Sequence, residues 1–156
     1  MDVKPLSGMT RQVLARARSE AFFFHHDQIQ PEDMLAAIVG LPHCHAARLL
    51  RKLEVNLHFV MREIVAAKGF GPVRKKVLDP GLSAASTRVL ERAAEESRAL
   101  SAEFIGTEHV LLGLLREESV ASHILANRLG VQADEVRCLA KGWAGVPTAE
   151  DPAQGA

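Results

Sequence analysis

The sequence is poor in several features that carry particular functions. Its 156 residues include only two cysteines, and nineteen basic side chains are balanced by nineteen acidic ones. The balance disfavours the broad electropositive surface on which nucleic-acid binding usually rests, so we expect no nucleic-acid partner. Cys44 and Cys138 form no framework of regular spacing, which is typical of free thiols in a reducing compartment.

Long apolar runs are missing as well. No run approaches the roughly 20 residues that a membrane-spanning helix needs, and the first residues, 1–5, lack the apolar stretch of a secretory signal. We therefore expect a soluble, cytoplasmic protein with no membrane partner. Two folded halves joined by short connections favour a monomer.

Motifs for catalysis and for metal binding are also lacking. The sequence has neither a nucleophile elbow nor a zinc-protease spacing. His43, Cys44 and His45 lie near His25 and His26 in the sequence, but adjacent residues rarely direct their side chains at one ion. We expect no enzyme activity, no metal and no cofactor.

The most informative feature that is present is an internal repeat with an offset of 76 residues and no gap. Most repeated positions are apolar, as a packed unit requires, but Glu20/Glu96, Arg16/Arg92 and Glu32/Glu108 are not core types and need a second explanation. The other repeated residues are Leu6, Ser7, Val13, Leu14, Ala17, Ile29, Leu35, Leu49, Leu53, Val55 and Val60, which recur as Leu82, Ser83, Val89, Leu90, Ala93, Ile105, Leu111, Leu125, Leu129, Val131 and Val136.

Each copy has the apolar spacing of amphipathic helices. Ser7 or Thr10, and Ser83 or Ser86, are candidate N-caps of a long first helix. A second, apolar helix covers 34–39 or 110–115, with Pro31 in the first turn of one and Thr107 as cap of the other. Third helices are expected near 46–52 and 119–128, and fourth helices near 56–67 and 132–141.

These patterns predict an all-α fold: a duplicated four-helix repeat with eight helices, no sheet and a pseudo-twofold axis. We place one domain at 1–145, with repeat one at 6–67 and repeat two at 82–143. Glycines and prolines mark a linker at 68–81. The tail at 146–156 has almost no apolar content, so we expect it to be disordered.

The segment IGTEHVLLGLLRE at residues 105–117 closely resembles the signature of the Clp N-terminal domain, a double four-helix repeat at the front of the ClpC, ClpA and ClpB unfoldases. The segment IQPEDML at 29–35 resembles a weaker copy of it, and the resemblance extends over residues 6–143. No G-x-x-x-x-G-K-[ST] motif for nucleotide phosphates occurs. The resemblance therefore implies a stand-alone N domain that binds partners and does not hydrolyse ATP.

Glu32 and Glu108 are the first candidate site residues. Each falls in the first turn of its helix, where the helix dipole alone favours a carboxylate. The resemblance implies a sharper role, because the matching glutamates of ClpC-type N domains bind the guanidinium of phosphoarginine. A carboxylate pairs well with a guanidinium, and a helix N-terminus can receive phosphate.

The two copies differ in how well they keep this motif. The second copy has Thr107 before the glutamate and His109 after it. The first copy has Pro31 in place of the threonine, which removes a hydroxyl and an N–H donor, and Asp33 in place of the histidine, which adds negative charge. We therefore expect the better ligand site in the second copy.

Three consecutive phenylalanines suggest a second surface. At about 100° per residue a helix cannot bury Phe22, Phe23 and Phe24 on one narrow stripe. Phe24 continues the core stripe, so Phe22 and Phe23 are candidates for a partner-binding patch. A wide buried face, or contact with the C-terminal tail, is the alternative explanation.

The resemblance implies binding to substrates or adaptors of a Clp unfoldase, including phosphoarginine-marked proteins. The protein would act as an adaptor or as a decoy, and further candidate partners are a ClpC-type ATPase and cyclic-peptide antibiotics. The alternative is a diverged helical scaffold or regulatory interaction protein that has lost the Clp ligand site.

Overall fold

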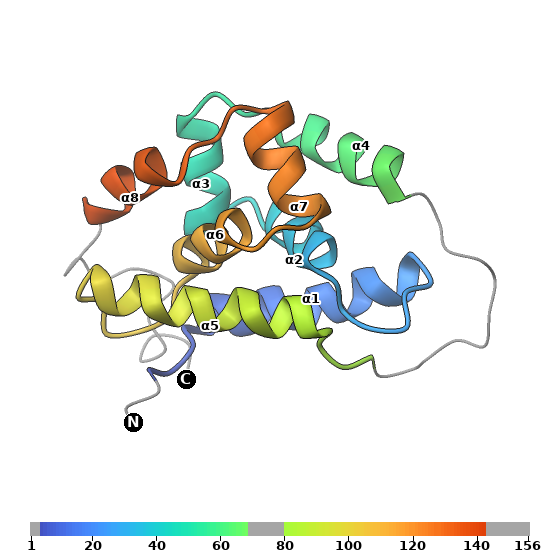
Figure 1. Cartoon of the computed structure of the whole chain (residues 1–156), viewed down its shortest axis with the longest axis horizontal. Coiled ribbons are helices and arrows are strands. Elements are labelled where there is room, and N and C mark those ends of the chain that lie inside the picture. The colour runs from blue at the N-terminus through green and yellow to red at the C-terminus, as the bar shows by residue number, and fades with distance from the viewer. Residues whose placement is uncertain (1–3, 69–79, 143–156) are drawn as a thin grey trace.

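A computed structural model describes residues 4–68 and 80–142, and every regular element in these two ranges is helical (Figure 1). With η1 counted as the continuation of α7, the described chain has eight helices, which confirms the predicted all-α class. The predicted tail and most of the predicted linker lie outside the described residues. The elements are α1 Gly8–Phe23, α2 Pro31–Val39, α3 His45–Lys52, α4 Leu57–Lys68, α5 Ala84–Ala99, α6 Thr107–Arg116, α7 Val120–Ser122, η1 His123–Arg128 and α8 Ala133–Lys141.

The starts of α1 and α5 are built in the same way. The Oγ atoms of Ser7 and Ser83 each accept a hydrogen bond of 3.1 Å from the backbone N–H three residues on, so these serines are the N-caps. The alternative candidates, Thr10 and Ser86, use their hydroxyls differently. They donate across to the other repeat, to the carbonyl oxygens of Ile105 and Ile29, at 2.8 and 2.6 Å.

Short parallel backbone bridges accompany these hydroxyl contacts. Leu6 pairs with Ile105, and Ile29 pairs with Leu82, with N–H···O distances of 2.8 to 3.0 Å. The sequence pattern predicted no strand pairing here. Because both bridges join one repeat to the other at equivalent positions, they follow the pseudo-twofold relation between the repeats.

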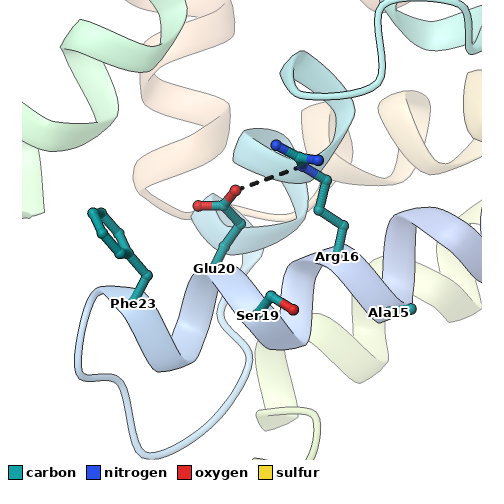
Figure 2. A pocket seen from close by; sticks show the side chains of 5 residues that line it. All are labelled: Ala15, Arg16, Ser19, Glu20 and Phe23. Carbon is teal, nitrogen blue, oxygen red and sulfur yellow. Dashed lines mark ion pairs between the residues drawn. The ribbon is translucent and has the colours of Figure 1, made fainter.

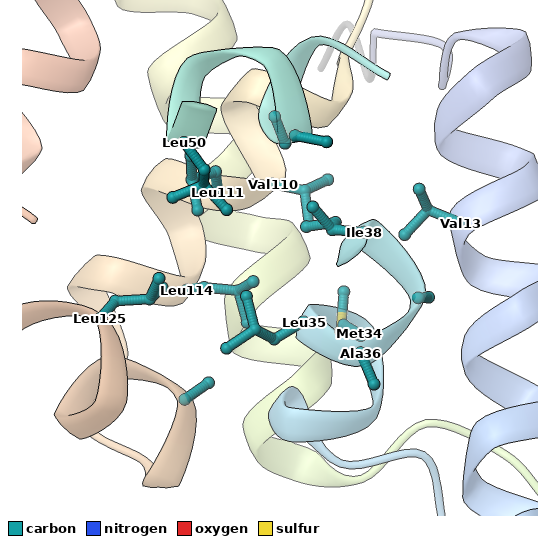
Figure 3. Packing of buried hydrophobic residues seen from close by; sticks show 14 of the residues in the cluster. Val13, Met34, Leu35, Ala36, Ile38, Leu50, Val110, Leu111, Leu114 and Leu125 are labelled. Carbon is teal, nitrogen blue, oxygen red and sulfur yellow. The ribbon is translucent and has the colours of Figure 1, made fainter. Parts of the chain in front are cut away.

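Helices α2 and α6 occupy the middle of the molecule (Figure 1). In Figure 1, α1 and α5 form the lower side, and α3, α4, α7 and α8 lie above. Residues 31–38 of α2 and 107–114 of α6 are all buried, so even the first turns of these helices belong to the interior. Figure 3 shows core side chains that meet here: Met34, Leu35 and Ile38 with Val110, Leu111 and Leu114.

Helices α5 and α6 approach each other closely at Gly113 of α6. A Cβ atom at this position would lie 2.3 Å from the backbone oxygen of Val89 and 3.3 Å from the backbone nitrogen of Ala93, both on α5. The missing side chain is therefore what lets the two helices meet at this distance.

The two cysteines are free, with Cys44 buried and Cys138 exposed. Cys44 is the N-cap of α3, and its sulfur accepts from the backbone N–H of Ala47 at 3.5 Å. Over residues 4–68 and 80–142, no helix combines the length and the apolar character needed to cross a membrane.

Candidate functional site

The carboxylate of Glu108 points into the interface between the two repeats. Glu108 is the second residue of α6, and its Oε2 atom lies 3.0 Å from Nδ1 of His45, the first residue of α3. Both side chains are about one-tenth exposed or less. The best candidate ligand residue is thus already paired with a histidine that the sequence analysis considered only as a metal ligand.

Thr107 joins the same two helix starts. Its Oγ1 accepts from the backbone N–H of Ala46 at 3.0 Å and so caps α3, in the other repeat. The prediction that Thr107 caps its own helix is wrong, because Gly106 is the N-cap of α6 and Thr107 is the first helical residue. A hydroxyl one position inside the helix can reach outward to a neighbouring helix start.

His109 makes a hydrogen bond within the start of its own helix. Its Nδ1 accepts a hydrogen bond of 2.8 Å from the backbone N–H of Gly106, which closes the first turn of α6. An imidazole nitrogen that accepts from an N–H carries no proton, so the ring is neutral with hydrogen on Nε2. Burial lowers the pKa of His109 and outweighs the attraction of Glu108, in agreement with this neutral form.

Opposing effects act on the pKa of Glu108. Burial raises it, but the hydrogen bond from His45, together with smaller electrostatic contributions, outweighs burial, and the pKa of Glu108 is lowered. The second carboxylate oxygen, Oε1, is buried and accepts no hydrogen bond from any described residue. It lies 3.9 Å from Nδ1 of His109.

His109 should make the protein less stable in mild acid. Because the folded-state pKa is below the unfolded value of 6.5, the unfolded chain binds more protons between these two values. The free energy of unfolding is then fully developed above about pH 6.5 and decreases as the pH falls through the folded pKa. Urea unfolding at several pH values should show this decrease, and His109→Asn, which keeps an acceptor for Gly106, should weaken it. An equal decrease in both proteins would contradict the assignment.

The first repeat has a related arrangement around Glu32. Pro31 is the first residue of α2, as predicted, and Pro31, Glu32 and Asp33 are all buried. Asp33 stands where His109 stands in repeat two: its Oδ2 accepts from the backbone N–H of Gln30 at 2.8 Å and lies 2.8 Å from Nδ1 of His26. The negative charge that Asp33 adds is therefore paired with groups inside the fold.

The three phenylalanines divide as predicted. Phe24 is 2% exposed, whereas Phe22 is 36% and Phe23 is 58% exposed. Phe24 packs edge-to-face on Phe23, with ring centroids 5.3 Å apart. The exposure of Phe22 and Phe23 is confirmed, and their role as a partner patch remains a prediction.

An open depression of about 660 Å³ lies beside Phe23 on α1 (Figure 2). Sequence reasoning did not locate it, although the repetition of Arg16 and Glu20 as non-core residues was the available signal. Its lining residues are Ala15, Arg16, Ser19, Glu20 and Phe23.

The duplicated all-α fold, with a buried glutamate in the first turn of both α2 and α6, defines a class of helical repeat domain. Comparison with known proteins identifies the family. The model of the Clp repeat (R) N-terminal domain matches residues 6–128. The chain belongs to this family, as the sequence resemblance predicted.

Relatives with this domain are much longer proteins. The chain is 34% identical over 123 residues to the ATP-dependent Clp protease ATP-binding subunit ClpC of Staphylococcus saprophyticus. It is 33% identical over 128 residues to a probable Clp protease ATP-binding subunit of Chlamydia pneumoniae. These matches cover 78% and 81% of this chain but only 15% of each relative.

Solved structures support the fold. The Hsp104 N-terminal domain from Candida albicans superimposes with a TM-score of 0.76 at 16% identity and covers 98% of this chain and 100% of that one. A ClpV N-domain in complex with a VipB peptide superimposes with a TM-score of 0.72 at 19% identity, covering 93% of this chain and 89% of that one.

Proposed function

We propose that this protein is a non-catalytic binding module for substrates, adaptors or peptide ligands of a Clp unfoldase, and that Glu32 and Glu108 serve phosphoarginine-type sites. Family membership supports the binding role, and so does the ClpV N-domain that was solved with a bound peptide. The observation that carries the proposal is the placement of two equivalent carboxylates in the first turns of α2 and α6.

The second site has suitable chemistry for such a ligand. Oε1 of Glu108 is a buried acceptor with no hydrogen bond from the described residues, and a guanidinium could supply one. The start of α6 has backbone N–H groups that favour a phosphate. Because the side chain of Glu108 is 10% exposed, the ligand must displace neighbouring groups to reach it.

Calorimetric titration with phosphoarginine tests the proposal. We expect heat of binding for the wild type, and about tenfold or weaker affinity for Glu108→Gln, since a charge-assisted hydrogen bond is lost. Glu32→Gln reports the contribution of the first repeat. Arginine without phosphate is the matched ligand control. Absence of binding to a folded protein would contradict the phosphoarginine sites.

The pairing of Glu108 with His45 favours a second candidate function. If the pair is purely structural, the protein is a diverged scaffold or regulatory interaction protein whose partners bind elsewhere. Glu108→Gln would then change stability but leave every interaction unaltered.

The wider role follows from the same binding proposal. In the cytoplasm, the module would present cargo to a ClpC-type ATPase as an adaptor, or withhold it as a decoy. Cyclic-peptide antibiotics that target ClpC-type N domains are further proposed ligands.

A further inference from the structure

The two repeats differ in what surrounds the repeated glutamate, which is Glu20 in repeat one and Glu96 in repeat two. In repeat two, Glu96 is held by two arginines from other helices. Arg137 of α8 donates from Nε and Nη2 to the two carboxylate oxygens at 2.8 and 3.0 Å, and Arg116 of α6 donates from Nη1 at 3.0 Å. Arg137 thus forms the parallel two-bond contact that a planar guanidinium makes best.

Repeat one has the carboxylate without these two arginines. At the same offset of 76 residues, Gly40 stands in place of Arg116 and Met61 in place of Arg137. Over the described residues, Glu20 has one ion pair, with Nε of Arg16 at 3.7 Å, which is beyond hydrogen-bond distance. The depression on α1 therefore lies at the carboxylate whose equivalent is covered by two guanidinium groups in repeat two.

The geometry around Glu20 suits a cationic group with a flat face. Figure 2 shows Glu20 between the Phe23 ring and the Arg16 guanidinium, with all three side chains on the same side of α1. The side chain of Glu20 is 15% exposed. Burial raises the pKa of Glu20, Arg16 lowers it, and the charge of Asp33 raises it. The positive charge of Arg16 therefore does not fully offset the cost of burying the Glu20 carboxylate.

We propose that this depression binds an arginine side chain of a partner polypeptide, with the guanidinium on the carboxylate of Glu20 and against the Phe23 ring. Repeat two shows that the fold tolerates this arrangement, because Glu96 accommodates two guanidinium groups there. Arg16 need not leave, since its guanidinium lies over Gly40, where a Cβ atom would be 2.3 Å from Nε. An aromatic face adds attraction for a guanidinium. The site uses neither Glu32 nor Glu108 and is independent of the proposed function.

The test uses Nα-acetyl-arginine amide, whose only charge is the guanidinium, and follows backbone amide shifts of the intact protein. We expect saturable shifts at residues 15–23 at millimolar concentration, and binding weaker by about tenfold for Nα-acetyl-citrulline amide, the matched uncharged compound. Glu20→Gln should abolish these shifts, whereas Glu108→Gln should leave them unchanged. Equal shifts with citrulline amide, or shifts that survive Glu20→Gln, would overturn the proposal.

A second variant provides the site with its own arginine. Met61→Arg introduces the residue found at the equivalent position in repeat two. We expect its guanidinium to pair with the carboxylate of Glu20 and so to prevent binding of the arginine amide. Glu96→Gln is the matched control, because it removes the carboxylate that is already covered and should leave binding intact. A folded Met61→Arg protein that still binds with unchanged affinity would contradict the proposed location. If that variant does not fold, the Glu20→Gln result decides alone.

Discussion

Gly113→Ala should destabilise the protein by about 2 kcal/mol, because the new methyl group overpacks the contact between α5 and α6. The methyl carbon would lie 2.3 Å from the backbone oxygen of Val89, and backbone atoms cannot move aside as the end of a side chain can. Replacing glycine by alanine inside a helix normally stabilises by about 0.5–1 kcal/mol, so the expected sign is opposite to that of intrinsic helix propensity.

Urea unfolding of Gly113→Ala and Gly8→Ala measures the effect against a control. Gly8 also lies in a helix, but a Cβ atom there would meet only Nη2 of Arg11, at 3.9 Å. We expect Gly8→Ala to be neutral or slightly stabilising. Equal stabilities of the two variants would show that α6 can shift away from α5 at little cost.

Glu108→Ala should lower the free energy of unfolding by about 3 kcal/mol, since it removes the carboxylate that is hydrogen-bonded to His45 inside the fold. The expected loss for Glu108→Gln is smaller, about 1 kcal/mol, because the amide oxygen can still accept from an imidazole N–H. Chemical unfolding at neutral pH gives both values. This difference is also why the binding experiments use glutamine.

A double-mutant cycle with His45→Ala isolates the pair itself. If the two residues act together, the double variant should be more stable than the sum of the single losses predicts. Additive losses would mean that the 3.0 Å contact contributes little and that Glu108 stabilises its own helix start. That outcome would favour its availability to a ligand.

The sequence predicted the architecture well because the repeat constrains the apolar pattern twice. Helix starts at Gly8, Pro31 and Leu57 recur 76 residues later at Ala84, Thr107 and Ala133. The spacing predicted helices and could not predict that α2 and α6 would be enclosed on all sides. A polar triplet in a first turn gives the same pattern whether it faces solvent or a neighbouring helix.

The contacts of the candidate site could not be predicted from the sequence, for a different reason. His45 and Glu108 are 63 residues apart and lie in different repeats, at positions that the repeat does not relate to each other. Local pattern shows which residues are unusual, and only tertiary packing shows which of them meet. The depression at Glu20 could not be predicted for the same reason. It depends on Gly40 and Met61, which become informative only when they are compared with Arg116 and Arg137 in the other repeat.

The exchanged backbone bridges have a consequence for the origin of the fold. Leu6 pairs with Ile105 and Ile29 with Leu82, so each repeat completes the backbone hydrogen bonding of the other. Two identical, separate copies could make the same contacts about a true twofold axis, as an isologous homodimer does. The present chain has the geometry expected from such a dimer after gene duplication and fusion, in which covalent linkage lets the two ancestral subunits diverge independently.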